Sequence, residues 1–192
     1  KPTKLPDIQH RFTDRHLGKS LAAREQFDLI PEAERSHTPE SKLTAARLFY
    51  LEGRLDAALS ELAALLHSEP DHAAALLLQG KILLSQSDLM PAITALTRSL
   101  QRDPTSMGGH YLLGQAYARA GDERNASKHL AEHEKLRSTR VLINRLEIEA
   151  ACKPHDGAIR RRLVELYNSI GLFQQAQFWT NAAALNPSPR QP

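Results

Sequence analysis

Between residues 39 and 136, small and large apolar residues recur at a fixed spacing of 34 positions. Small residues fill two columns of this repeat, large leucines fill a third, and prolines mark the turns. The matching positions are Ala46, Gly80 and Gly114, then Ala58, Ala92 and Ala126, then Leu62, Leu96 and Leu130, and finally Pro70 and Pro104. Four columns with one common period indicate an internal repeat rather than a coincidence.

Apolar residues between these columns follow a helical period, so each repeat is expected to form a hairpin of two helices. Gly53 and Gly121 are expected at the turns inside the hairpins, because glycine adopts the left-handed backbone that such helix ends need. Large residues such as Leu48, Ile82 and Leu130 are expected to fill the core between successive hairpins. The predicted helices cover 39–52 and 55–68, 73–86 and 89–102, and 107–120.

The chain changes character after the third hairpin. Residues 123–151 contain neither proline nor glycine. Their pattern predicts one long helix, kinked near Ser138, that Pro154 ends. A last hairpin follows, with Gly171 at its turn. Its offset from the third hairpin is not a multiple of 34, so we expect a degenerate repeat that caps the array.

The repeat length and the columns resemble those of tetratricopeptide repeats. This resemblance implies an all-α fold, a right-handed α-α superhelix of about four hairpins, in which each hairpin covers its apolar face by stacking on its neighbours. The expected parts are an extended N-terminal arm (1–38), three repeats (39–72, 73–106 and 107–136), a helical extension and turn (137–155), the capping hairpin (156–187) and a disordered tail (188–192).

Composition excludes several classes of function. The 25 Lys and Arg residues barely outnumber the 22 Asp and Glu residues, so no electrostatic footprint for nucleic acid is expected. The longest apolar run, Ala73 to Leu78, is far too short to cross a bilayer as a helix. Cys152 is the only cysteine, so no disulfide forms within the chain. The chain begins at Lys1 rather than Met, and we therefore expect a processed protein or a piece of a longer one.

No motif in the sequence points to catalysis. The run His-x-x-Glu-His at 129–133 resembles a zinc-hydrolase motif, but the repeat already explains this helix and no third ligand is evident, so no metal is expected. Cys152-x-x-His155 is half of a metal site without a second half. The basic run 160–162 is expected to form a solvated face, with an acidic partner or a haem propionate as the alternative. We expect a protein that is not an enzyme.

The arm carries 13 charged residues and three prolines before residue 39, and is expected to be extended. Within residues 1–16, the order His10, Phe-Thr-Asp and His16 resembles the segment that follows the last haem motif of bacterial multihaem c-type cytochromes with C-terminal tetratricopeptide repeats. Arg15 departs from that pattern, in which the second histidine follows the aspartate directly.

This second resemblance implies that His10 and His16 are distal axial ligands to haem iron. It also implies an electron-transfer protein of the bacterial periplasm or cell surface, of which the chain is the C-terminal part or a close partner. The chain contains no Cys-x-x-Cys-His, so it binds no haem c covalently, and the haem would belong to an associated cytochrome or to a haem domain of the same polypeptide. The alternative is a polar arm with two solvated histidines.

The first helix of each hairpin lines the concave face of a tetratricopeptide array, where the family commonly holds a partner's segment. The predicted register gives an apolar groove with a basic line, which suits an apolar segment carrying carboxylates. Its residues are Leu43, Arg47 and Tyr50, then Leu77, Lys81 and Leu84, then Tyr111, Gln115 and Arg119. Two functions remain open: a scaffold for a cytochrome, and a free-standing, cytoplasmic adaptor without a redox role. The same side chains could also form an ordinary exposed surface or meet the chain's own arm.

Overall fold

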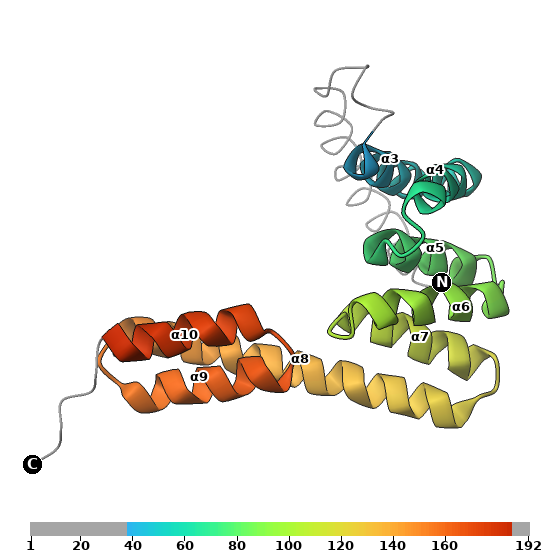
Figure 1. Ribbon diagram of the computed structural model, residues 1–192. Coiled ribbons are helices and arrows are strands. Elements are labelled where there is room, and N and C mark those ends of the chain that lie inside the picture. Colours follow the sequence, from blue (N-terminus) through green and yellow to red (C-terminus); the bar gives the residue numbers. More distant parts are fainter. Residues whose placement is uncertain (1–37, 186–192) are drawn as a thin grey trace, which may run out of the picture. The chain divides into compact units, whose positions relative to one another are not determined.

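A computed structural model describes residues 38–185 of the chain (Figure 1). This described part contains eight α-helices and no strand, so the predicted all-α fold is confirmed. The arm residues 1–37, including His10 and His16, lie outside the described part, as do residues 186–192. The helices are α3 (Pro39–Leu51), α4 (Leu55–Ser68), α5 (Ala73–Ser85), α6 (Leu89–Arg102), α7 (Met107–Arg119), α8 (Glu123–Cys152), α9 (Gly157–Ser169) and α10 (Phe173–Leu185).

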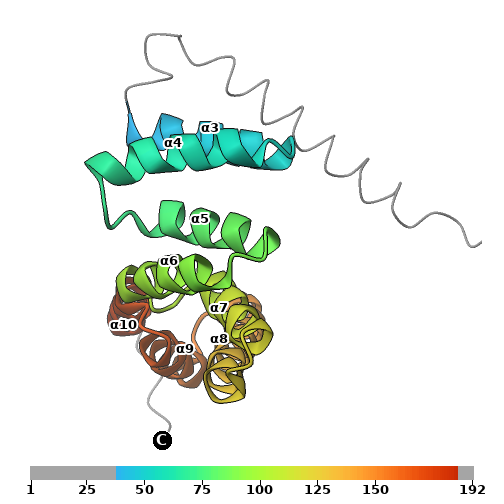
Figure 2. The same cartoon turned by 90° about the vertical axis from the view of Figure 1, so that its right-hand side faces the viewer.

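Consecutive helices pair as hairpins: α3 with α4, α5 with α6, α7 with α8, and α9 with α10. The chain divides between Pro104 and Thr105 into two compact units, each with its own buried apolar cluster. In the first unit, α5 also packs against α3 and α4, so the second hairpin stacks on the first (Figure 2). In the second unit, α9 packs against α8 as well as α10.

Side-chain caps explain where the first helix of each hairpin begins. Thr38, His72 and Ser106 each accept a hydrogen bond from the backbone N–H three residues later, at 3.1, 3.2 and 3.3 Å. These caps satisfy N–H groups that the helix itself leaves unpaired. The three caps follow the repeat spacing, whereas Asp156, which caps α9, comes later than that spacing predicts. The last hairpin has therefore left the repeat register.

The turns inside the four hairpins all use a residue with a left-handed backbone. Gly53 and Gly121, which were predicted at these turns, have φ angles of 76° and 81°, and Gly171 has 73°. Ser87 occupies the same column in the second hairpin and has a φ of 66°. A left-handed backbone costs a residue with a Cβ roughly 1–2 kcal/mol. Ser87 is therefore a strained position in an otherwise well-packed unit.

Replacing Ser87 with Gly is expected to raise the free energy of unfolding by about 0.5–1 kcal/mol. Relief of the backbone strain exceeds the extra entropy that glycine gives the unfolded chain. Urea denaturation followed by circular dichroism measures the change. Gly53→Ser is the matched reverse change and should lose about 0.5–1 kcal/mol. A destabilised Ser87→Gly variant would mean that side-chain interactions of Ser87 outweigh the strain.

The small-residue column lies where the two helices of a hairpin touch. A Cβ built on Gly80 would lie 2.5 Å from Cγ of Leu96, and one built on Gly114 would lie 2.8 Å from Cγ of Leu130. Both distances are shorter than real contacts between carbon atoms. Ala46, at the same position of the first hairpin, is completely buried. The column therefore sets how closely the paired helices approach.

Most of the predicted core is buried, but Leu130 is not. Leu62, Ile82 and Leu96 have no exposed surface, and Leu48 is buried. Leu130 packs on Gly114 yet keeps 37% of its surface exposed, so its prediction as a core residue was wrong. The repeat pattern assumes that the next hairpin follows in register and covers this side chain. The last hairpin begins later than that register requires.

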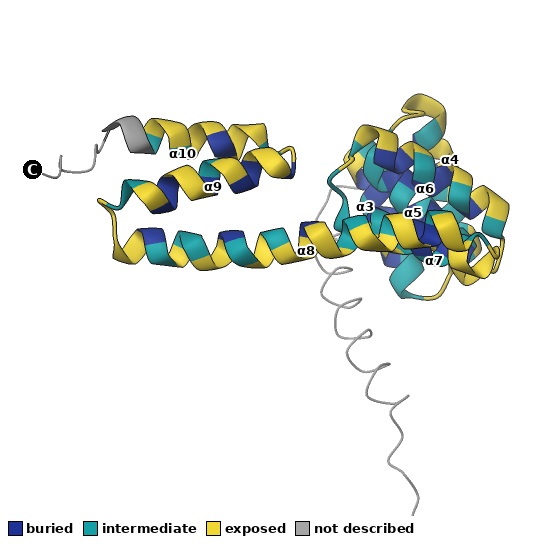
Figure 3. Ribbon diagram, turned by 90° about the horizontal axis from the view of Figure 1, so that it is seen from below, coloured by how far each residue is buried: buried dark blue, intermediate teal, exposed yellow. Residues whose placement is uncertain are grey.

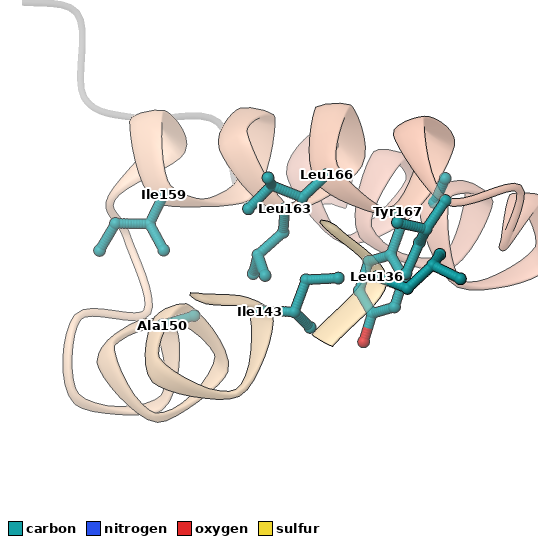
Figure 4. Close-up of a cluster of buried hydrophobic side chains, with 9 residues drawn as sticks. Leu136, Ile143, Ala150, Ile159, Leu163, Leu166 and Tyr167 are labelled. Carbon is teal, nitrogen blue, oxygen red and sulfur yellow. The ribbon is translucent and has the colours of Figure 1, made fainter. Parts of the chain in front are cut away.

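The long helix α8 joins the third hairpin to the last one and continues without a break at Ser138. Leu136, Ile143 and Ala150 recur at heptad spacing along it and pack against a cluster from α9 and α10 that includes Leu163 (Figure 4). Buried and exposed positions alternate along this half of the helix (Figure 3). The second half of α8 therefore forms one side of the buried apolar cluster of the second unit.

Candidate functional site

In the first unit, the predicted groove residues lie on the two helices α3 and α5, which contact each other. The ammonium of Lys81 lies 4.7 Å from the ring centroid of Tyr50, within the range of a cation–π contact. Arg47 and Lys81 are exposed, while Tyr50 is half-buried. The structure thus places two basic side chains and one aromatic side chain on this pair of helices, which we call the α3–α5 face (Arg47, Tyr50, Leu77 and Lys81).

Two of the predicted groove residues have little solvent-exposed surface that a partner could contact. Leu43 and Leu84 are buried beneath the α3–α5 face, so they support the packing of the helices instead of meeting a partner. Leu77 is half-buried and offers a smaller apolar contact. The apolar part of the site is therefore narrower than the sequence predicted.

The basic side chains of the α3–α5 face lack a carboxylate partner within the described part of the chain. Among residues 38–185, neither Arg47 nor Lys81 takes part in a salt bridge. Other exposed cations of the same unit are paired, such as Arg98 and Arg102 with Asp71. The face therefore presents two positive charges that suit an acidic group.

The remaining groove residues lie on α7, in the second unit. Tyr111 is 43% exposed, and its hydroxyl accepts a hydrogen bond from Nε2 of Gln115 at 2.9 Å. The centroid of the Tyr111 ring also lies 5.2 Å from that of the His133 ring on α8. Arg119 is exposed at the end of α7. These side chains mix aromatic, amide and basic character on one helix.

The two histidines of the 129–133 motif face different partners. Nδ1 of His133 donates to the backbone carbonyl of Met107 at 3.0 Å. One repeat earlier, the Ser99 hydroxyl donates to the carbonyl of Ala73 at 2.8 Å, so this bond belongs to the repeat geometry. Among the residues that the structure describes, no group of three or more potential ligands could hold a metal ion.

His129 pairs instead with His110 on α7. Their Nδ1 atoms are 3.1 Å apart, so one donates a hydrogen bond and the other accepts it. Tyr117 stacks on the His129 ring, with centroids 5.8 Å apart and planes 9° from parallel. Burial lowers the pKa of His129, and the neighbouring His110 and Lys128 lower it further. This pair of histidines lies outside the α3–α5 face, and the sequence did not predict it.

The comparisons with known proteins agree with the helical hairpins described above. Residues 43–106 and 81–136 match the family model of the tetratricopeptide repeat. Residues 43–136 contain tetratricopeptide repeats. Such repeats are in general non-catalytic modules that bind other proteins through the surface of the stacked hairpins. The predicted repeats are thereby confirmed over the part of the chain that carries the repeat columns.

Solved structures with a similar fold include MamA, with 17% identity, coverage of 95% of this chain and 96% of that one, and a TM-score of 0.50. A MamA fragment from Desulfovibrio magneticus RS-1 has 17% identity, 95% coverage of each chain and a TM-score of 0.54. TTC0263, a tetratricopeptide protein of Thermus thermophilus, has 22% identity and a TM-score of 0.48, and the match covers 80% of this chain and 93% of TTC0263. No curated protein sequence matches the chain significantly. At these identities the MamA structures support the fold alone.

The third tetratricopeptide hairpin is expected to lose stability in acid through His129. Its pKa is lowered on folding, so the unfolded chain binds a proton first as the pH falls. The free energy of unfolding should therefore be constant above about pH 6.5 and fall below it. Urea midpoints between pH 7.5 and pH 5 measure the slope. His129→Gln should flatten it and His67→Gln, at an exposed position on α4, should not. Equal slopes in both variants would contradict the assignment.

The basic run after the last repeat does not form one charged patch. Arg160 is buried and donates to the backbone carbonyl of Ala182 on α10 at 3.1 Å, so its prediction as part of a solvated face was wrong. Arg161 and Arg162 are exposed, and Arg162 pairs with Glu165 at 2.8 Å. Successive residues of a helix point about 100° apart, which separates the three side chains.

Tyr167 ties the last hairpin to α8. Its hydroxyl donates to Oε1 of Glu147 at 2.6 Å. Burial, together with this acceptor carboxylate, raises the pKa of Tyr167 to about 12. The phenol therefore stays protonated and serves a structural purpose.

Three further features of the described residues lie outside the sites discussed above. Cys152 is an exposed thiol at the end of α8. None of the described helices is both long enough and apolar enough to cross a membrane. On α9 and α10, the residues Arg161, Val164, Glu165 and Thr180 line an open pocket with largely apolar walls.

Proposed function

We propose that the protein is a non-catalytic scaffold that binds an acidic segment of a partner protein on the α3–α5 face. The observation that carries this proposal is the pair of exposed cations Arg47 and Lys81 on the first helices of two stacked tetratricopeptide repeats. Carboxylates on an extended segment would pair with these cations, and apolar side chains between them would contact Tyr50 and Leu77.

The Lys81–Tyr50 contact supports a defined geometry for such a partner. The ring holds the ammonium in place, which reduces the side-chain freedom lost when a carboxylate binds. Each exposed ion pair contributes only about 0–1 kcal/mol in water. Binding through this face is therefore expected to be modest and sensitive to salt, because salt screens exposed charges.

The test uses a fluorescein-labelled peptide of alternating leucine and glutamate, with a twin in which glutamine replaces glutamate. Fluorescence anisotropy should show tighter binding of the glutamate peptide, weakened by added salt. Arg47→Glu and Lys81→Glu should each weaken it about three- to tenfold, since reversing a charge changes an attraction into a repulsion.

Arg145→Glu is the matched control, because it reverses an exposed charge on α8 and changes the net charge equally. It should leave the affinity within about twofold of the original protein. Equal binding of the two peptides, or an equal loss in all three variants, would exclude the α3–α5 face as the binding site.

We further propose that the partner is a multihaem c-type cytochrome, with His10 and His16 as axial ligands to haem of that cytochrome or of a haem domain in the same polypeptide. Support comes from residues 1–16, whose sequence resembles the segment after the last haem motif in cytochromes with tetratricopeptide repeats. The neutral imidazole of histidine is a common axial ligand of haem iron. The same scaffold function would then serve electron transfer in the bacterial cell envelope.

Visible spectroscopy of the protein purified from its native source tests the cytochrome proposal. A Soret band should be present, and His10→Ala should shift it because a low-spin haem loses one axial ligand. A native protein without any Soret band would leave the free-standing adaptor as its function. The peptide experiment is independent of this outcome, since it measures only the α3–α5 face.

A further inference from the structure

We propose that His110 and His129 form a binding site for one divalent transition-metal ion of the class that prefers imidazole, namely Cu²⁺, Ni²⁺ or Zn²⁺. The site lies between α7 and α8 in the second unit, on different helices from those of the α3–α5 face. It uses one histidine of the 129–133 motif and a second histidine outside that motif.

The distance between the two Nδ1 atoms is the main support. They are 3.1 Å apart. Metal–nitrogen bonds to histidine measure about 2.0–2.1 Å. If one ion bound both atoms at this separation, the N–metal–N angle would be about 95–102°. This angle lies between the octahedral and tetrahedral values. Rotations about the side-chain bonds of the two histidines would then aim both lone pairs at one ion.

The chemistry of the pair also suits a metal ion. In the metal-free pair, one Nδ1 carries the hydrogen that the other accepts. When the ion binds, that hydrogen moves to Nε2 of the same ring, and both Nδ1 lone pairs then point to the metal. A metal ion binds the neutral form of imidazole, so each ring would bind the ion through an unprotonated nitrogen.

The two histidine rings already lie next to each other before any ion binds. Tyr117 stacks on His129, and His110 lies in the first turn of α7. Both ligands come from helices, which position a site more accurately than loops do. His110 and His129 are each half-buried, so water molecules can complete the coordination from the open side.

The competing arrangement is the one that the motif itself suggests. His129 and His133 are one helical turn apart and could share an ion with Glu132 nearby. His133 is instead bound to the Met107 carbonyl, and Glu132 pairs with Lys135 at 3.0 Å. The two arrangements share His129 but differ in the second ligand, so single substitutions separate them.

Isothermal titration of the full chain with Cu²⁺, Ni²⁺ and Zn²⁺ tests the proposal. One equivalent should bind at the pair, most tightly for Cu²⁺, following the usual order of divalent affinities. His110→Gln and His129→Gln should each weaken this equivalent at least tenfold. His133→Gln and the exposed His67→Gln should keep it within about threefold. Circular dichroism confirms that each variant is folded.

A second measurement does not depend on the metal affinity. Pulsed electron paramagnetic resonance of the original protein with one equivalent of Cu²⁺ should show two coordinated imidazoles, and the His110→Gln protein should show fewer. The proposal is overturned if no stoichiometric ion binds, if one imidazole is coordinated in the original protein, or if His133→Gln abolishes binding while His110→Gln retains it.

Discussion

Replacing Leu96 with Ala is expected to lower the free energy of unfolding of the first unit by about 2–5 kcal/mol. Leu96 has no exposed surface, and its Cγ lies directly against the backbone of Gly80 on the paired helix. Truncating the side chain therefore leaves a cavity that the rigid hairpin cannot close. Urea denaturation of the full chain, followed by circular dichroism, should show the midpoint of this unit shifted downwards.

Leu130→Ala provides the matched control for this prediction. Leu130 occupies the same column one repeat later and packs on Gly114 in the same way, but 37% of its surface is exposed. Its truncation should cost about 1 kcal/mol or less, since much of the side chain already contacts water. Equal losses at the two positions would contradict the difference in burial between the hairpins.

Gly80→Ala is expected to destabilise the first unit by about 1–2 kcal/mol, although alanine favours a helix. A new Cβ would come within 2.5 Å of Leu96 Cγ and 3.3 Å of the Ala92 backbone carbonyl. Overpacking of this kind costs about 1–3 kcal/mol, and the higher helix propensity of alanine offsets at most about 1 kcal/mol. Thermal unfolding and urea denaturation both measure the net loss.

Two further variants decide whether this contact is the cause. Gly114→Ala should cost less than Gly80→Ala, because the exposed Leu130 side chain can turn away and only its backbone nitrogen, 3.3 Å from the new Cβ, stays in place. The Gly80→Ala, Leu96→Ala double variant should be less destabilised than the sum of the two single changes, since the second change removes the atoms that clash. Strict additivity of the two changes would show that the contact does not limit the packing.

The repeat spacing predicted the local structure well because register is a local property. Each of the first five expected helices matches the observed one to within one residue at either end. The small-residue column around Gly80 lies at the helix contact. The caps Thr38, His72 and Ser106 were not predicted, yet they share the same spacing and could have been found from it.

The solvent exposure of individual side chains was harder to predict, because it depends on which neighbouring helices pack against a hairpin. Leu130 has the spacing of a core residue, but the chain does not continue with a hairpin in register that would cover it. Leu43 and Leu84 were assigned to a binding groove from their helix positions and proved to be buried. The repeat pattern gives the direction of a side chain along the helix, whereas neighbouring elements decide whether it meets solvent.

The pair His110 and His129 was missed because the two residues are far apart in the sequence and lie on different helices. A motif of neighbouring positions, such as the one at 129–133, indicates contacts within one helix only. His110 and His129 occupy two repeat positions, one on each helix of the hairpin, that contact each other. A comparison of these two positions across the repeats would have revealed the pair. In earlier repeats the same positions hold Leu76 with Ala95 and Lys42 with Glu61, so among these three hairpins the third carries two imidazoles there.

The length of α8 separates two sets of contacts within the second unit. As one helix, α8 spans about 45 Å at the usual rise per residue. The α7 helix packs along its first half and α9 along its second. Sharp bends in a helix need proline, glycine or an inserted residue, and α8 contains neither proline nor glycine. α8 therefore keeps the contacts with α7 along its first half and the Tyr167–Glu147 bond near its other end a fixed distance apart.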